Sequence, residues 1–191
     1  MDALVLCEGS TESEIVKIII EKLKPAAEKN NRSCRLRGNR FSNSISSVMI
    51  LLTRLFKRVK AIGVILDSEN FTVEKRIMSF VDSLNAKGLK VRNFEQICHQ
   101  TFILHLENQN LKIYMSVSGV HEFSNFKRHS IEDHRVLLLL RRNPNIEGRI
   151  RSVESAQEII SKDILLHLVK GASTEELYKT CTHIFCLLKN L

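Results

Sequence analysis

Short apolar runs alternate with segments of helical periodicity along the first half of the chain. Residues 3–7 (ALVLC) and 59–66 (VKAIGVIL) are almost continuously apolar, as expected of strands that are covered on both faces. A further short strand is predicted at 34–36. Three segments carry apolar residues at helical spacing: 11–28, 42–57 and 72–86. The alternation of strand and helix predicts an α/β fold with a mostly parallel sheet flanked by helices.

The second half of the chain changes pattern. Residues 100–117 predict two strands around a turn at 107–110, which form a hairpin, and a polar loop follows at 118–130. Three helices are then predicted: 131–142, 153–170 and 174–191. We therefore predict an α/β domain over residues 1–142 and a helical C-terminal extension over 143–191. The extension is expected to pack on the domain, with a small separate cap as the alternative.

The charge of the chain indicates the kind of partner it binds. The formal net charge is +8, from 29 Lys and Arg against 21 Asp and Glu. A basic balance of this size suits a polyanion, and nucleic acid (DNA or RNA) is the partner we predict. The candidate nucleic-acid-binding residues lie in two basic clusters and are Arg37, Arg40, Lys57 and Arg58. Each cluster taken alone is also typical of a solvated face.

The pattern predicts neither a targeting segment nor a membrane span. Residues 1–7 lack the basic start and long apolar run of a signal peptide, and the longest apolar stretch, 136–140, is far below the ~18 residues that cross a bilayer. Five cysteines without a Cys-x-x-Cys pair fit buried thiols in a reducing compartment better than a disulfide framework. We therefore predict a cytoplasmic protein with no membrane partner.

Acidic residues follow both apolar runs. Glu8 comes directly after residues 3–7, and Asp67 and Glu69 come directly after residues 59–66. The carboxyl ends of parallel strands share one edge of a sheet, so these three carboxylates converge if the two strands are neighbours. Like charges at close range are unfavourable without a cation between them, and oxygen ligands favour Mg²⁺ or Mn²⁺. The pattern therefore predicts a metal site in which the cation joins the acids to phosphate.

The acids of the first segment also have a structural interpretation. Glu8, Glu12 and Glu14 suit the positive end of the helix that follows them. Thr11 and Glu14 have the form of a capping box at the start of that helix. Asp67 has the alternative role of an N-terminal cap or Asx turn.

A third acidic segment lies at the start of the helix at 131–142. Glu132 and Asp133 follow Ser130, so they fit a helix cap, and a second metal position is the alternative. His129 and His134 flank them. We interpret both histidines as exposed polar residues near the cap, and a catalytic or ligand role stays open.

Three motifs resemble those of the Toprim superfamily. The strand leading into Cys7-Glu8-Gly9-Ser10-Thr11-Glu12 is similar to its first motif, and ILDSEN at 65–70 resembles its Asp-x-Asp motif. Residues 130–133 (SIED) are similar to a Leu-Glu-Asp segment of stand-alone Toprim-like proteins. The resemblance covers about residues 3–142 and implies a Toprim-like, Rossmann-like fold, close to the nuclease domain of overcoming-lysogenization-defect proteins.

The resemblance also implies roles for individual residues. It makes Glu8 the acid/base glutamate or a metal ligand, Asp67 and Glu69 metal ligands, and Glu12 an auxiliary ligand as in the overcoming-lysogenization-defect group. Glu69 departs from the aspartate that is usual in the family.

Two functions are consistent with these features. The first is Mg²⁺-dependent (or Mn²⁺-dependent) phosphodiester chemistry on nucleic acid, by a Toprim-type nuclease. The second is a non-catalytic binding or assembly module, with a protein partner or a second copy, in a defence or repair complex. Residues 9–11 have no lysine of a Walker loop, which argues against nucleoside triphosphate hydrolysis. The chain has two tyrosines, Tyr114 and Tyr178, neither in a topoisomerase-like context, which argues against strand passage.

Overall fold

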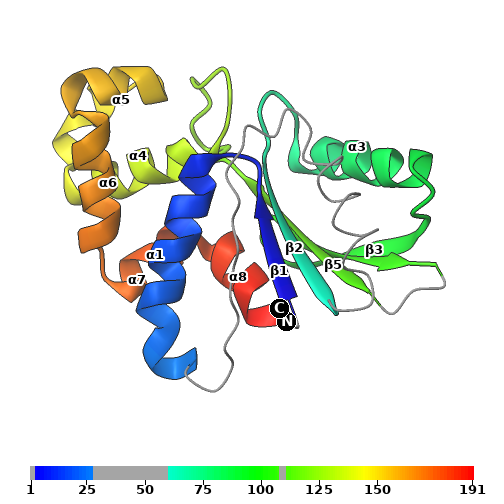
Figure 1. The fold of residues 1–191 in the computed structure, drawn as a ribbon. Coiled ribbons are helices and arrows are strands. Elements are labelled where there is room, and N and C mark those ends of the chain that lie inside the picture. The colour runs from blue at the N-terminus through cyan, green and yellow to red at the C-terminus, as the bar shows by residue number, and fades with distance from the viewer. Residues whose placement is uncertain (1–2, 28–59, 108–110) are drawn as a thin grey trace.

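The computed structural model describes residues 3–27, 60–107 and 111–191 (Figure 1). The strand predicted at 34–36 and the helix predicted at 42–57 lie outside these residues. The same is true of the four candidate nucleic-acid-binding residues, Arg37, Arg40, Lys57 and Arg58.

Five strands form one mixed sheet in the order β1-β2-β5-β4-β3. The strands are β1 Ala3–Cys7, β2 Ala61–Asp67, β3 Val91–Cys98, β4 Thr101–Leu106 and β5 Lys112–Ser118. The neighbours β1, β2 and β5 run parallel, whereas β4 is antiparallel to both β5 and β3. The predicted α/β fold and the hairpin of β4 and β5 are confirmed at this level, and β1 and β2 are parallel neighbours, which is the condition for their acids to converge.

Helices cover both faces of the sheet (Figure 1). The helix α3 Val73–Ala86 lies on one face, and α1 Ser10–Ala27 and α8 Thr182–Asn190 lie on the other. The remaining helices are α4 Ile131–Arg142, the 3₁₀ turn η1 Pro144–Arg149, α5 Val153–Ile159, α6 Lys162–Gly171 and α7 Thr174–Thr180. The structure is therefore layered as helix, sheet and helix.

Alternate residues of the central strands contribute to two separate hydrophobic clusters. Val64 packs in one cluster with Phe80 of α3. Val5 and Ile65 pack in the other cluster with Ile19 of α1. Full burial of one such side chain contributes about 2 kcal/mol. Burial on both faces is the reason that β1 and β2 are continuously apolar in sequence.

The C-terminal extension packs on the α/β layers. Val169 of α6, Leu177 of α7 and Ile184 of α8 share a cluster with the strands and α1. A Cβ atom placed on Gly63 of β2 would lie 2.8 Å from side-chain atoms of Leu187 and Leu191. The glycine therefore allows α8 to approach the sheet closely.

The two helices predicted at 153–170 and 174–191 are wrong in length, because each is broken into two. Ser161 starts α6 anew, since its side chain accepts a hydrogen bond from the Ile164 amide. At Cys181 the backbone leaves helical geometry (φ −122°, ψ 42°) between α7 and α8. The apolar spacing continues through both breaks, so it could not locate them.

The strand β3 is absent from the sequence prediction. Its residues from Arg92 to Gln96 are exposed, so it shows no apolar face, and it lies at the edge of the sheet. Its register with β4 shifts at two places, as is common in edge strands. Pairing with β4, rather than burial, defines this strand.

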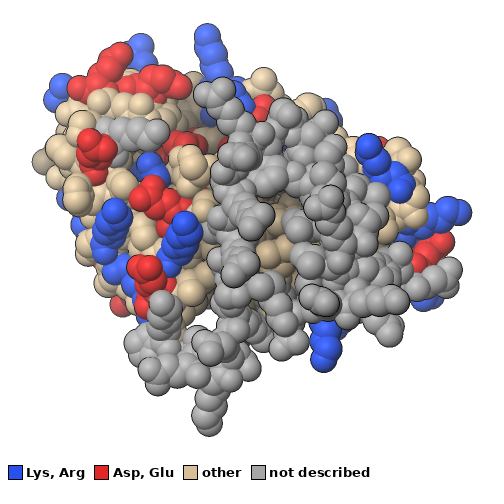
Figure 2. All heavy atoms as spheres, in the orientation of Figure 1, with Lys and Arg blue, Asp and Glu red and all other residues tan. Residues whose placement is uncertain are grey.

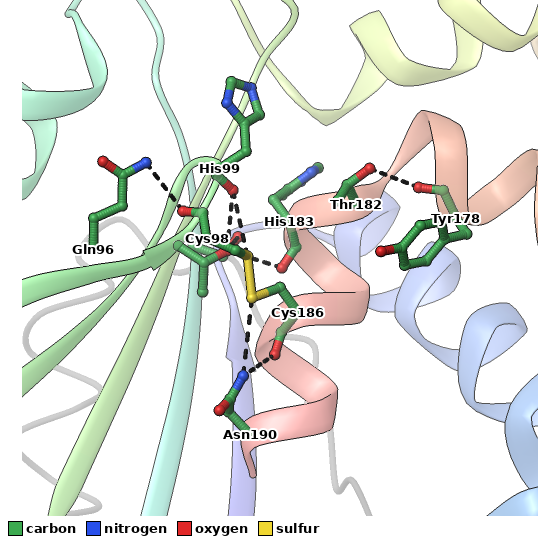
Figure 3. Close-up of a disulfide and its surroundings, with 10 residues drawn as sticks. Gln96, Cys98, His99, Tyr178, Thr182, His183, Cys186 and Asn190 are labelled. Atoms are coloured by element: carbon green, nitrogen blue, oxygen red, sulfur yellow. Dashed lines mark hydrogen bonds between the residues drawn. A yellow bond between two sulfur atoms is a disulfide. The ribbon is translucent and has the colours of Figure 1, made fainter.

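A disulfide joins Cys98 at the end of β3 to Cys186 in α8, across 88 positions of sequence (Figure 3). The prediction of unpaired thiols is wrong for these two residues. Cys181 stays a thiol, and burial raises its pKa to about 12. The pairing depends on α8 lying against the sheet, which the spacing of cysteines could not indicate.

Within the described residues, every helix is too short or too polar to cross a lipid bilayer.

Candidate functional site

Glu8 and Asp67 lie together where β1 and β2 end. Cys7 pairs with Ile65 in the parallel ladder, so the residues that follow these strands emerge at one edge. The amide of Glu8 donates to the Ile65 carbonyl at 3.1 Å. The amide of Asp67 in turn donates to the Glu8 carboxylate at 3.0 Å. The predicted convergence of these two residues is therefore observed.

A carboxyl pair, buried Glu12 and half-buried Asp67, lies beside Glu8. Glu12 is in the first turn of α1 and is 2% exposed. Burial raises the pKa of Asp67 to about 9, and the charge of Glu12 and a hydrogen bond to it add to the rise. Burial also raises the pKa of Glu12, to which the charges of Glu132 and Glu8 contribute. The pair therefore shares one proton at neutral pH, with Asp67 as donor and Glu12 as acceptor.

Asp67 also caps α4, across 64 positions of sequence. Its Oδ1 accepts a hydrogen bond from the amide of Ile131, the first residue of that helix, at 2.8 Å. Ser130 is the N-cap residue, as the SIED segment predicted, but its side chain makes no cap bond. The cap comes from a distant strand instead.

Asp133 has a second role besides the one predicted, and it is fully buried. Its Oδ2 accepts from the Val120 amide at 3.1 Å and lies 2.9 Å from His129 Nδ1. Its Oδ1 has no hydrogen-bond partner among the described residues. Asp133 therefore holds the loop before α4 as well as the helix start, where its carboxyl accepts from the Ser130 amide.

Two glutamates of the site are paired with arginines. Arg76 of α3 donates to both oxygens of Glu8 at 3.1 Å. Arg128, from the loop before α4, donates to Glu69 Oε1 at 2.5 Å. Glu69 has a left-handed backbone (φ 56°), and its amide and carbonyl bond to His129. The three carboxylates predicted to share one ion are therefore divided between a buried pair and two ion pairs.

The capping box predicted at the start of α1 is wrong. The helix begins at Ser10, and the Ser13 amide donates to the Gly9 carbonyl, so Thr11 lies inside the first turn. The carboxylate of Glu14 points toward the C-terminal helices, 3.9 Å from Arg135 and 3.8 Å from Lys170.

The interpretation of His134 as exposed is wrong, because it is 5% exposed. Burial lowers its pKa to about 4, so the ring is neutral at pH 7. Its Nδ1 lies 2.7 Å from the Thr180 carbonyl and its Nε2 accepts from the Gly119 amide at 3.2 Å. The His129 side chain is also largely buried, at 14% exposure. Both histidines flank two acids in the sequence, a pattern typical of a polar helix start. This pattern does not indicate that either ring is buried.

Gly119 allows the loop after β5 to pass close to the site. Its φ is +141°, and a Cβ atom there would lie 2.6 Å from Ser68 Oγ and 2.7 Å from His129 Cβ. We expect Gly119→Ala to lower the free energy of unfolding by about 2 kcal/mol, because strain and overlap act together. Denaturant unfolding measures this change.

Gly148→Ala is the matched control for Gly119→Ala. Nothing lies within 4 Å of a Cβ atom at Gly148. We expect this variant to stay within about 0.5 kcal/mol of the wild type. Equal losses in the two variants would contradict the role assigned to Gly119.

The fold and the site together define an α/β protein with a desolvated carboxyl pair at the carboxyl ends of parallel strands. Comparisons with protein-family models, with curated proteins and with solved structures found no match. The Toprim resemblance therefore depends on the motifs of this sequence alone.

Proposed function

We propose that this protein carries out Mg²⁺-dependent phosphodiester chemistry on nucleic acid, as a Toprim-type nuclease. The observation that supports this function best is the Glu12–Asp67 pair beside Glu8. Desolvated carboxyl groups that share a proton are unfavourable for folding, and they are common where a site binds a cation or transfers protons. Their position at the carboxyl ends of adjacent parallel strands is where α/β proteins bind ligands.

The donor set of this pair suits magnesium. Mg²⁺ is usually held by one or two carboxylates together with water and substrate phosphate, rather than by a complete cage of protein ligands. The described residues contain no group of three or more Asp, Glu, His or Cys arranged to hold a metal. Asp67 and Glu12 supply the two oxygen donors that such a shared site requires. We propose Glu8 and Glu69 as additional ligands that would leave their arginine partners when the cation binds.

The proposed roles of the residues follow from their positions. Magnesium, when bound, would polarise the scissile phosphate and stabilise the leaving oxygen. Asp67 and Glu12 would hold the cation, and their shared proton would pass to solvent water when it binds. Glu8, whose side chain is 23% exposed, is placed to exchange a proton with water or with the leaving group. The Asp67 amide orients the Glu8 carboxylate for this exchange.

Metal-dependent cleavage of DNA and RNA tests the proposed function. We expect Glu8→Gln and Asp67→Asn each to lower the cleavage rate by about a hundredfold, because each removes a group that acts in the reaction. The matched controls are Glu107→Gln and Asp82→Asn, exposed carboxylates outside the site, which should cleave at the wild-type rate. Equal rates in all five proteins would exclude this site.

The ion pairs favour a second function, a non-catalytic binding or assembly module. Glu8 and Glu69 already have arginine partners within the chain, so their charges are balanced without a cation. Calorimetry separates the two functions. Absence of Mg²⁺ binding at about millimolar concentration, together with a shift from monomer to complex on adding a partner, would favour the module.

We also propose a cytoplasmic location. The supporting features are the basic net charge and the nucleic-acid substrate proposed above. Disulfides are rare and usually transient in the cytosol, so this location implies that Cys98 and Cys186 are thiols for part of the time in the cell.

A further inference from the structure

Two arginines from different elements form ion pairs with two glutamates of the site, Glu8 and Glu69. Arg76 comes from α3 and is 18% exposed, and its Nε is buried without a hydrogen-bond partner among the described residues. Arg128 comes from the loop before α4 and is 65% exposed. One arginine is thus embedded at the site, whereas the other reaches it from solvent.

Both guanidinium groups lie in the field of the same acids. The pKa of Arg128 is raised first by its hydrogen bond to Glu69 and by the charge of that residue. The charges of Asp67 and Glu8 raise it further. Because Arg76 bonds directly to Glu8, the same carboxylate acts on both arginines.

Neither arginine is part of the basic clusters of the sequence. The basic net charge does not by itself locate a surface that binds nucleic acid, as Figure 2 shows. On the face drawn there, basic and acidic side chains lie side by side over the helices at the left, rather than in one basic patch. A phosphate contact on this protein would therefore depend on specific pairs of residues.

We propose that Arg76 and Arg128 form a clamp for a backbone phosphate of nucleic acid, and that Glu8 and Glu69 occupy this clamp in the free protein. A planar guanidinium binds carboxylate and phosphate through the same pair of N–H donors, so the two anions compete for it. The glutamates therefore act as internal competitors of the substrate. The identity of the polyanion rests on the function proposed above.

Binding without cleavage tests this clamp. The probe is a fluorescein-labelled single strand of about 20 nucleotides, as DNA and as RNA, titrated in EDTA and followed by fluorescence anisotropy. We expect Arg76→Gln and Arg128→Gln each to weaken binding about tenfold and to lower the salt dependence of log Kd by about one unit. The double variant Glu8→Gln/Glu69→Gln should bind about tenfold more tightly than the wild type, because it frees both arginines.

Matched controls separate the clamp from net charge. Arg92→Gln removes an arginine near the start of β3, at the opposite end of the sheet, and should weaken binding by no more than about twofold. Glu107→Gln/Glu147→Gln removes two exposed acids outside the site and should tighten binding by no more than about twofold. Thermal unfolding of each variant checks that it is folded.

Two outcomes would overturn the clamp. One is a loss of binding affinity in Arg92→Gln as large as that in Arg76→Gln. The other is a Glu8→Gln/Glu69→Gln variant that binds the strand no more tightly than Glu107→Gln/Glu147→Gln. Failure of the proposed nuclease is a separate result. It would appear as no cleavage with Mg²⁺ while the pattern of binding in EDTA is as expected.

Discussion

Asp67→Asn is expected to become progressively more stable than the wild type as the pH rises, by about 4 kcal/mol between about pH 5 and about pH 8. The native protein holds a proton on Asp67, because burial and the charge of Glu12 raise its pKa to about 9. Asparagine has the same shape and no charge. Its Oδ1 can accept the Ile131 amide, and its amide group can donate to Glu12 as the protonated carboxyl does.

The sign of this effect follows from the protons bound by each state. Between the ordinary pKa of 3.8 and the folded value of about 9, the native state keeps the proton of Asp67 and the unfolded state releases it. The stabilising contribution of this group is therefore complete below about pH 4. It is lost as the pH rises toward 9, at up to about 1.4 kcal/mol per pH unit. The asparagine variant lacks this loss.

Urea unfolding at several pH values measures the difference. Asp82→Asn, at an exposed position of α3, controls for the removal of an aspartate and should change stability by less than about 0.5 kcal/mol at every pH. The same pH dependence of the free energy of unfolding in the wild type and in Asp67→Asn would contradict the shared proton. A variant that gains stability and loses cleavage would show that the carboxyl pair is maintained for function at the expense of folding.

Reduction of the Cys98–Cys186 disulfide is expected to lower the free energy of unfolding by about 4 kcal/mol. The bond closes a loop of 88 positions, and a closed loop restricts the unfolded chain more than the native one. The bond also holds α8 against the sheet at its edge strand. The double variant Cys98→Ser/Cys186→Ser should lose the same stability without any reductant.

Unfolding with and without dithiothreitol measures this contribution. The reductant should lower the stability of the wild type to that of the double serine variant and should leave the variant unchanged. A wild type that does not respond to the reductant would contradict a stabilising bond. Alkylation of thiols in intact cells, followed by mass spectrometry, then reports whether the two cysteines are reduced, as a cytoplasmic location implies.

Much of the architecture could be predicted from periodicity. The strands β1 and β2 are buried on both faces and therefore have continuous apolar runs, and α3 and α4 have clear apolar spacing with polar starts. The strand β3 could not be predicted, because it is exposed and depends on hydrogen bonding to β4. The breaks within the last helices lie in uninterrupted apolar spacing.

The candidate site was predictable in part. The positions of Glu8 and Asp67 after two buried strands indicated that they meet, and the ladder between β1 and β2 brings them together. The sequence also predicted that Glu69 joins them. Glu69 instead pairs with Arg128, from a loop 59 positions later, and no local pattern indicated this partner. Arg76 had no signal in the sequence, because its position in α3 resembles any basic residue on a helix surface.

The sequence by itself determined which apolar segments form the buried strands β1 and β2 and which acids end them, because apolar runs and strand ends leave local patterns. Only the tertiary structure decided which partner each acid has. Glu12 shares a proton with Asp67, Glu8 binds Arg76, and the cap of α4 comes from β2. Such pairings join elements that are far apart in the sequence. Hydrogen bonds and charge interactions depend on the distance between groups in space, which local sequence patterns do not contain.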